Sequence, residues 1–206
     1  AINMPYEPGS VMKILTMAAA LDLGAVTPQT SYTDVGYFPI GGATIRNWDE
    51  DAWGIQDMTG CLQHSLNVCL AWIAVEMGTD NFYGYMAKFG FGHPTGIDLS
   101  GEAGGRLKIP GDADWYPVDL ATNSFGQGIT ATPIQMMMAT SAVANSGVMV
   151  TPHLLYGMVR DGKQYDFPPQ NAGNPISKET AQTLSEMLAN SLALEESEAL
   201  VPNYRL

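Results

Sequence analysis

Apolar residues near the start of the chain recur at three- and four-residue spacing, which places them on one face of a helix. These positions are Met12, Leu15, Ala19 and Leu23. The preceding Pro8-Gly9 pair indicates a turn, and Ser10 after it is a favoured N-cap or first-turn residue. Gly24 is a typical residue just past a helix C-terminus. The pattern therefore predicts a helix that begins near Ser10 and ends at Gly24.

Similar apolar patterns, bounded by turn residues, predict further helices. They cover about 57–64, 68–77, 80–89, 134–145 and 177–195, with one helical turn at 119–124. Asp57 or Thr59 is a suitable cap for the first of these, and Thr132-Pro133 for the helix at 134–145. Segment 68–77 is apolar nearly all round, which predicts a buried helix.

The remaining segments carry turn residues or loosely alternating patterns. Residues 25–57 are predicted to be irregular, with one short strand or hairpin at 36–42, and residues 90–117 are rich in turns. Residues 148–159 predict one or two strands, with Asp161-Gly162 as a hairpin turn. A Pro/Asn linker is expected at 166–176, a solvated helix end at 195–198, and the approach to a strand at 200–206.

Composition narrows the class of protein. A chain of 206 residues with 46% hydrophobic and 15% charged residues can bury the core of one domain, or of a large piece of one. Its net charge of −12 disfavours nucleic acid and anionic membranes as partners. We expect Cys61 and Cys69 to be buried small hydrophobes, because two cysteines are too few for a disulfide scaffold or a cysteine zinc site.

Ser10 and Lys13 lie three positions apart at the start of the first helix, where such side chains share a face. A serine hydroxyl becomes a nucleophile when a nearby base takes its proton, and a lysine with a lowered pKa can do so. The alternative is an N-cap serine beside a solvated lysine, since a Ser-x-x-Lys pair occurs often by chance.

Three other groups are candidates for the same site. Ser65 and Asn67 lie between two predicted helices, where they either contribute chemistry or only cap helix ends. Trp53 either fills the edge of the core or lines a ligand cleft. Gly126-Gln127-Gly128 permits close backbone approach, and a phosphate loop is disfavoured because no strand precedes it and no Gly-Lys-Ser/Thr follows.

In this order, the segments resemble the transpeptidase domain of class B high-molecular-weight penicillin-binding proteins over nearly the whole chain. Residues 6–13 are similar to the family's Ser-x-x-Lys motif with its Pro-Gly lead-in, and residues 64–68 to its Ser-x-Asn motif. Further similar stretches are 88–92, 95–102, 119–122, 126–129, 132–135 and 142–147.

The resemblance implies an α+β fold, in which a five-stranded antiparallel sheet packs on a helical subdomain. The family's third motif, Lys-Thr/Ser-Gly, is expected just after Leu206 and is absent, as are the strands that precede Ser-x-x-Lys. We therefore expect residues 1–206 to be a partial transpeptidase domain, truncated at both ends, that covers mainly the α-helical subdomain with a few short strands.

The resemblance also implies a mechanism. Ser10 attacks the penultimate D-Ala carbonyl of a peptidoglycan stem peptide to form an acyl-enzyme, and Lys13 accepts the Ser10 proton. Ser65 passes a proton toward the departing amine, and Asn67 hydrogen-bonds Lys13 and the substrate. The Ser10 N–H and an N–H of the absent strand form the oxyanion hole. Trp53, Gly126, Gln127 and Gly128 are the expected substrate-binding residues.

Other implications concern partners and alternatives. β-Lactams are expected to acylate Ser10, no metal or organic cofactor is called for, and other cell-wall synthesis proteins are conceivable partners. The implied location is the extracytoplasmic face of a bacterial membrane. The alternatives are a serine β-lactamase, a β-lactam sensor or non-catalytic binding domain, and an inactive fragment. For the β-lactamase, no glutamate has a sequence context that marks it for activating water, and Glu102 stays open by position alone.

Overall fold

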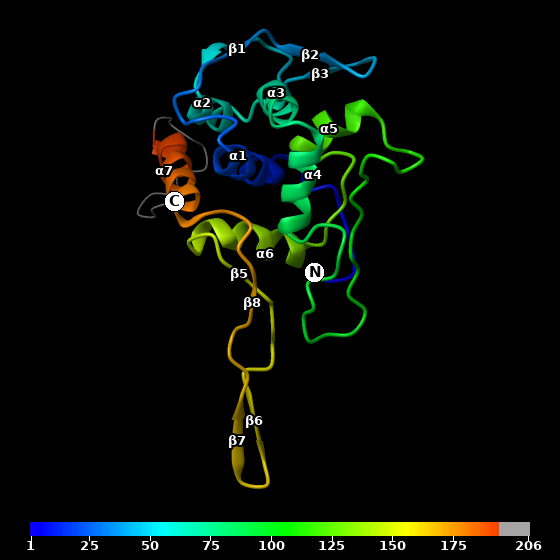
Figure 1. Ribbon diagram of the computed structural model, residues 1–206, viewed down its shortest axis with the longest axis vertical. Helices are drawn as coiled ribbons and strands as arrows, with labels where there is room; N and C mark the ends of the chain where they lie inside the picture. The colour runs from blue at the N-terminus through cyan, green and yellow to red at the C-terminus, as the bar shows by residue number, and fades with distance from the viewer. Residues whose placement is uncertain (194–206) are drawn as a thin grey trace.

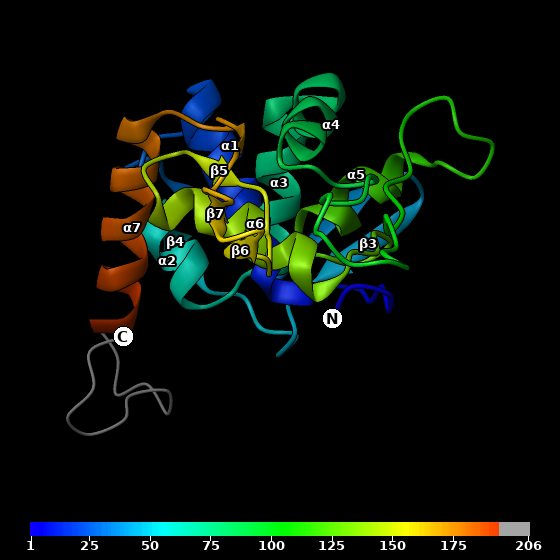
Figure 2. The ribbon, with the colours of Figure 1, turned by 90° about the horizontal axis from the view of Figure 1, so that it is seen from below.

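A single helix, α1 (Met12–Leu23), lies at the centre of the helical body in the computed structural model, which describes residues 1–193 (Figure 1). The other α-helices of this part are α2 (Met58–Gln63), α3 (Asn67–Met77), α4 (Thr79–Lys88), α5 (Pro117–Ser124), α6 (Pro133–Ala144) and α7 (Lys178–Ala193). Helices α3 to α7 all pack against α1. Figure 2 shows α7 and α5 on opposite sides of it.

Eight short strands form four separate two-stranded antiparallel sheets within residues 1–193. The pairs are β1 (Tyr32–Asp34) with β4 (Gly54–Gln56), β2 (Tyr37–Ile40) with β3 (Ala43–Arg46), β5 (Met149–Val150) with β8 (Asn171–Gly173), and β6 (Gly157–Arg160) with β7 (Lys163–Asp166). The predicted α+β class, mainly helical with a few short strands, is confirmed.

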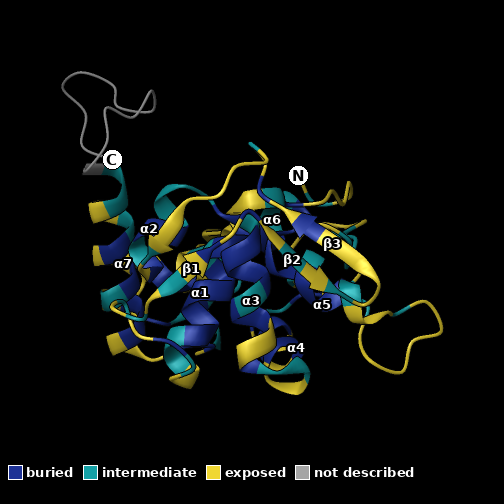
Figure 3. Cartoon of the chain, turned by 90° about the horizontal axis from the view of Figure 1, so that it is seen from above, coloured by how far each residue is buried: buried dark blue, intermediate teal, exposed yellow. Residues whose placement is uncertain are grey.

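The core consists of the faces that α1 and α3 turn toward their neighbours. Met12, Leu15 and Met17 of α1 have no exposed surface, and neither do Leu70 and Ile73 of α3. Figure 3 shows both helices largely in the colour of buried residues. The predicted burial of segment 68–77 is thus confirmed. The start of α1, just after Ser10, is packed into the core.

Local capping explains why several helices begin and end where the sequence predicts. Asp57 caps α2 by accepting a hydrogen bond from the Gly60 N–H at 2.7 Å, and Thr132 caps α6 through the Gln135 N–H. Gly24 ends α1 in the left-handed conformation, with φ of 75°. The turn predicted at 119–124 is instead the eight-residue α5, because Pro117 starts the helix and Asp119 accepts from the Tyr116 N–H.

Two predictions about loops are wrong in part. Residues 25–57 contain the expected hairpin, β2–β3, but also the pair β1–β4, whose strands are far apart in sequence. The predicted linker at 166–176 contains β8, which pairs with β5. In both missed pairs, strands of only two or three residues join segments that are not adjacent in sequence. No local pattern therefore indicates them.

The hairpin predicted at Asp161-Gly162 is confirmed, and β6–β7 projects from the helical body (Figure 1). The expected solvated end at 195–198 and the strand approach at 200–206 lie outside the described residues. None of the helices in residues 1–193 has the length and apolar character needed to cross a membrane.

Candidate active site

Ser10 lies in a single 3-10 turn, Gly9–Val11, that leads directly into α1. This turn is attached to the glycine segment predicted to belong to the site: the Gly9 N–H donates to the Gly126 carbonyl at 3.0 Å. The Gly128 N–H donates to Glu7 Oε1 at 2.9 Å, on the approach to the turn. Ser10 itself is exposed, so its hydroxyl is accessible to a ligand.

Lys13 lies one helical turn after Ser10, but its side chain is only 3% exposed. Its Nζ donates to the Ser65 backbone carbonyl and, at 2.9 Å, to Ser65 Oγ. Burial lowers the pKa of Lys13 from 10.5 to about 8, because desolvation disfavours the ammonium form. A lysine with this pKa is partly neutral near physiological pH and can then accept a proton.

Ser65 connects the two residues of the Ser-x-x-Lys pair. Its Oγ lies 3.1 Å from Ser10 Oγ and 2.9 Å from Lys13 Nζ, so the three polar atoms form a continuous hydrogen-bonded chain. The backbone of Ser65 has φ of 51°, a left-handed conformation that non-glycine residues seldom adopt. The turn between α2 and α3 thus directs its hydroxyl toward Ser10.

The hypothesis that Lys13 accepts the Ser10 proton stays a prediction. No hydrogen bond joins Lys13 to Ser10 within residues 1–193, and Ser65 Oγ occupies the position between them. The three residues are brought together as predicted, and Ser65 provides a hydrogen-bonded connection between Ser10 and Lys13.

Asn67, the first residue of α3, does not make the predicted contact with Lys13. Its Nδ2 donates to the Arg46 carbonyl at 3.1 Å, and in the described part of the chain no hydrogen bond joins it to Lys13. The Asn67 amide is directed instead toward the backbone carbonyl at the end of β3. A contact between Asn67 and substrate stays a prediction.

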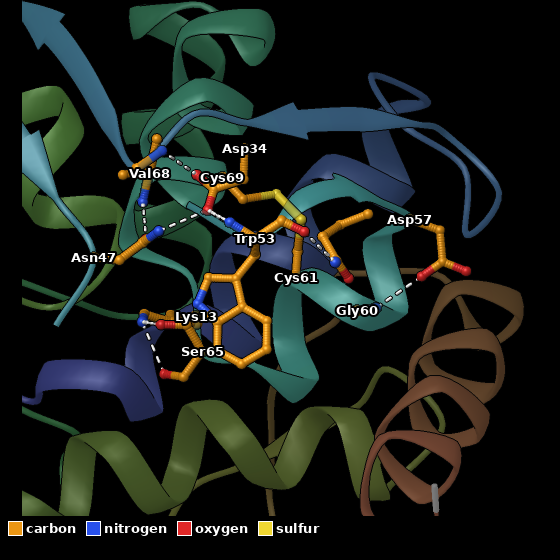
Figure 4. Close-up of a disulfide and its surroundings, with 12 residues drawn as sticks. Lys13, Asp34, Asn47, Trp53, Asp57, Gly60, Cys61, Ser65, Val68 and Cys69 are labelled. Carbon is orange, nitrogen blue, oxygen red and sulfur yellow. Dashed lines mark hydrogen bonds between the residues drawn. A yellow bond between two sulfur atoms is a disulfide. The ribbon is translucent and has the colours of Figure 1, made fainter. Parts of the chain in front are cut away.

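Trp53 lies next to the Ser65 turn. Its indole stacks on His64, with ring centroids 3.9 Å apart, and its Nε1 donates to Asp49 Oδ2 at 2.8 Å. The close-up in Figure 4 shows the indole beside Lys13 and Ser65. With 37% of its surface exposed, Trp53 is available to a ligand, and substrate binding stays a prediction.

The glycine segment makes the close backbone approach that the sequence analysis expected of its glycines. Gly126 has φ of 82°, and an added Cβ would lie 2.2 Å from the Gly9 carbonyl oxygen. Only glycine therefore allows this backbone to approach the Ser10 turn so closely. Gln127 is exposed and Gly128 half-buried. A contact of Gly126, Gln127 or Gly128 with substrate stays a prediction.

The interpretation of the cysteines as two free buried hydrophobes is wrong. Cys61 and Cys69 are both buried, but they form a disulfide with a Cα–Cα distance of 6.1 Å, drawn in Figure 4. Two cysteines are too few for a scaffold of several disulfides, but they suffice for the single bridge found here. The sequence feature that could have indicated the bridge is the position of the cysteines, which lie eight residues apart on either side of Ser65 and Asn67.

Two further residues next to this turn were missed. Asp34 and Asn47 are buried polar residues, and Asn47 hydrogen-bonds the start of α3. An aspartate and an asparagine in a turn-rich segment are usually turn residues, so no sequence pattern distinguished them.

This chain is similar to known proteins in both sequence and structure. The profile of the family described as "Penicillin binding protein transpeptidase domain" matches residues 1–204. The stage V sporulation protein D of Bacillus subtilis is 34% identical over 200 residues, which cover 95% of this chain and 28% of that protein. The peptidoglycan D,D-transpeptidase MrdA of Escherichia coli is 36% identical over 172 residues, or 77% of this chain and 26% of that protein.

Solved structures show the same fold. Penicillin-binding protein 3 of Mycobacterium tuberculosis, complexed with aztreonam, is similar with a TM-score of 0.85 and 30% identity, over 95% of this chain and 43% of that one. The D,D-transpeptidase domain of a peptidoglycan glycosyltransferase from Eggerthella lenta has a TM-score of 0.90 and 25% identity, over 100% and 53%. The chain spans just over a quarter of the length of the two curated relatives named above.

Proposed function

Because this chain belongs to the penicillin-binding protein transpeptidase family, we propose that it carries the serine acyl-transfer site of a peptidoglycan D,D-transpeptidase. The observation that supports this most is the hydrogen-bonded chain from Lys13 Nζ through Ser65 Oγ to Ser10 Oγ. It supplies an exposed nucleophile and a buried base, the two components that covalent acyl transfer requires.

Acylation begins with attack by Ser10 Oγ on the carbonyl of the penultimate D-Ala of a stem peptide. The Ser10 proton passes to Ser65, whose own proton passes to Lys13 Nζ. Backbone N–H groups in the first turn of a helix lack intrahelical acceptors, so the Ser10 N–H can bind the oxyanion. The D-Ala amine leaves with a proton returned by the same route, and the acyl group stays on Ser10.

The second half of the reaction runs the route in reverse. An amine from another stem peptide attacks the acyl-enzyme, its proton moves toward Lys13, and Ser10 is released with a new peptide cross-link formed. Asn67, Trp53 and the segment Gly126-Gln127-Gly128 surround this site, and we assign them to substrate binding. No step requires a metal or an organic cofactor.

β-Lactams acylate Ser10 through the same chemistry in this proposal. Penicillin-binding protein 3 of Mycobacterium tuberculosis has a similar fold, and its crystal structure contains the β-lactam aztreonam. This complex supports β-lactam binding by the family. The β-lactamase alternative needs a carboxylate free to activate water. The Glu102 carboxylate instead accepts hydrogen bonds from Thr95 and from the Gly96 N–H, so it is occupied in holding a turn.

We place this site on the extracytoplasmic face of a bacterial membrane. Disulfides persist in oxidising compartments and are rare in the cytosol, and the buried Cys61–Cys69 bridge supports such a location. Peptidoglycan stem peptides, the proposed substrates, lie in the same compartment. Other cell-wall synthesis proteins are proposed partners of the whole protein.

Incubation of the purified protein with a fluorescent penicillin tests the proposal. We expect a stable covalent mass increase on the peptide that contains Ser10, and none in Ser10→Ala. Rapid turnover of a chromogenic cephalosporin would favour the β-lactamase instead. Absence of labelling in this chain and in a longer one that continues past Leu206 would refute the assignment of Ser10.

A further inference from the structure

Helix α3, which carries Asn67 at its first position, has no cap of its own. Its N-cap residue is Leu66, whose side chain cannot accept a hydrogen bond. The N–H groups at the start of a helix need an acceptor when they are buried. Here the acceptor comes from a distant segment: the Val68 N–H donates to Asn47 Oδ1 at 3.2 Å.

The orientation of Asn47 is fixed by Asp34. The Asn47 Nδ2 donates to Asp34 Oδ2 at 2.8 Å and to the Asp51 carbonyl at 3.1 Å, so its Oδ1 must point toward α3. Asn47 is 3% exposed and Asp34 1%, so water does not compete for these bonds. A side chain whose amide donors and acceptor are all used in a buried site has one stable orientation.

Asp34 also connects Asn47 to the segment that carries Trp53. Its Oδ2 also accepts from the Trp53 N–H at 3.0 Å, and its Oδ1 accepts from the Gly36 N–H. One buried carboxylate thereby connects the segment that carries Trp53 to the start of α3. Figure 4 shows Asp34 and Asn47 between Trp53 and Val68.

The turn that this network supports is strained. Ser65 has φ of 51°, and non-glycine residues keep such a conformation when the surrounding structure holds them in it. On one side the Cys61–Cys69 disulfide closes the turn. On the other, Asn47 holds Val68 and the Arg46 carbonyl holds Asn67 Nδ2.

We propose that Asn47, anchored by Asp34, is a positioning residue that keeps Ser65 between Lys13 and Ser10. Asn47 does not touch the reacting atoms; it acts by fixing the start of α3 and therefore the turn before it. The effect on the reaction rests on the proposed function, whereas the effect on the turn does not.

The test compares Asn47→Ala with Ser177→Ala. Ser177 caps α7 by accepting from the Thr180 N–H, so the control removes a side-chain acceptor from the start of another helix. For each variant we would measure the acylation rate constant and the dissociation constant with a fluorescent penicillin, and amide hydrogen exchange over residues 65–68.

Asn47→Ala is expected to lower the acylation rate constant by about 10²-fold, because small displacements of a catalytic group have effects of this size. The dissociation constant should change much less, and exchange at residues 65–68 should accelerate. Ser177→Ala should alter none of the three. Unchanged exchange at residues 65–68, or an equal loss of acylation in both variants, would overturn the proposal.

Failure of the proposed function and failure of Asn47→Ala to fold can each be distinguished from failure of this proposal. If the unmodified protein is not acylated, the proposed function fails, and the exchange measurement still decides whether Asn47 positions the turn. If Asn47→Ala does not fold, Asn47→Asp keeps the volume and the acceptor for Val68 but loses the donor to Asp34. Its acylation rate constant should also fall, and an unchanged value would overturn the proposal.

Discussion

Ser65 Oγ lies 3.1 Å from Ser10 Oγ although 55 positions separate the two residues. The same oxygen accepts a hydrogen bond from Lys13 Nζ, the buried amine one helical turn from Ser10. A nucleophile and its base are thus joined through a third hydroxyl, and the position of that hydroxyl depends on the turn between α2 and α3.

Removal of the connecting hydroxyl in Ser65→Ala should lower the acylation rate constant by about 10²-fold or more, the usual contribution of a proton-transfer group. The dissociation constant for penicillin should change little, since Ser10 and its turn remain. Stopped-flow fluorescence separates the two constants. Ser141→Ala is the control, because Ser141 is exposed and its hydroxyl donates to the Met138 carbonyl of its own helix. Equal rates in Ser65→Ala and the unmodified protein would show that Lys13 acts without Ser65.

The acylation rate should depend on pH through Lys13. Burial lowers its pKa to about 8, and only the neutral amine accepts a proton. The rate constant should therefore rise about tenfold per pH unit below pH 8 and level off above it. Lys13→Arg should be inactive at every pH, because a guanidinium keeps its proton. A rate constant that is flat from pH 6 to pH 9 would contradict a role of Lys13 as base.

The same shift predicts a pH dependence of stability. The unfolded chain keeps the lysine proton up to the ordinary pKa of 10.5, whereas the folded protein releases it near pH 8. Between these values the unfolded state binds more protons, so the free energy of unfolding should rise with pH, by at most about 1.4 kcal/mol per unit. Urea unfolding at pH 7.5 and 9.5 measures this rise, and Lys13→Met should lack it.

Gly126→Ala should destabilise the protein and displace Ser10. The added Cβ would meet the Gly9 carbonyl oxygen at 2.2 Å, in addition to the strain of a φ of 82°. Gly42→Ala is a matched control, since Gly42 has φ of 80° with no atom within 4 Å of an added Cβ. The control should lose only about 1–2 kcal/mol of unfolding free energy and keep its acylation rate. Equal losses in both variants would contradict the close approach of Gly126 to Gly9.

Loss of the disulfide should cost stability. Replacing Cys61 and Cys69 together by serine should lower the free energy of unfolding by about 2.5 kcal/mol, from the loop-closure entropy of a bridge with a separation of eight residues. Urea denaturation measures the difference. Thiol titration of the denatured, unreduced protein should find no free thiol, and two thiols would contradict the bridge.

The sequence predicted those parts of the fold that depend on neighbouring residues. Apolar spacing identified α1, and Asp57, Thr132 and Gly24 marked helix ends, because capping bonds join residues within one turn. The pairing of β1 with β4 was missed, since strands of three residues so far apart leave no local pattern.

For the site, the sequence by itself determined that Ser10 and Lys13 share a helix face, because helical geometry brings residues three apart together. Only the tertiary structure decided that Ser65 stands between them, that Cys61 pairs with Cys69, and that Asn47 caps α3. Each of these contacts joins residues of different segments, and the packing of those segments sets the distance. Residue spacing along the chain does not encode that distance.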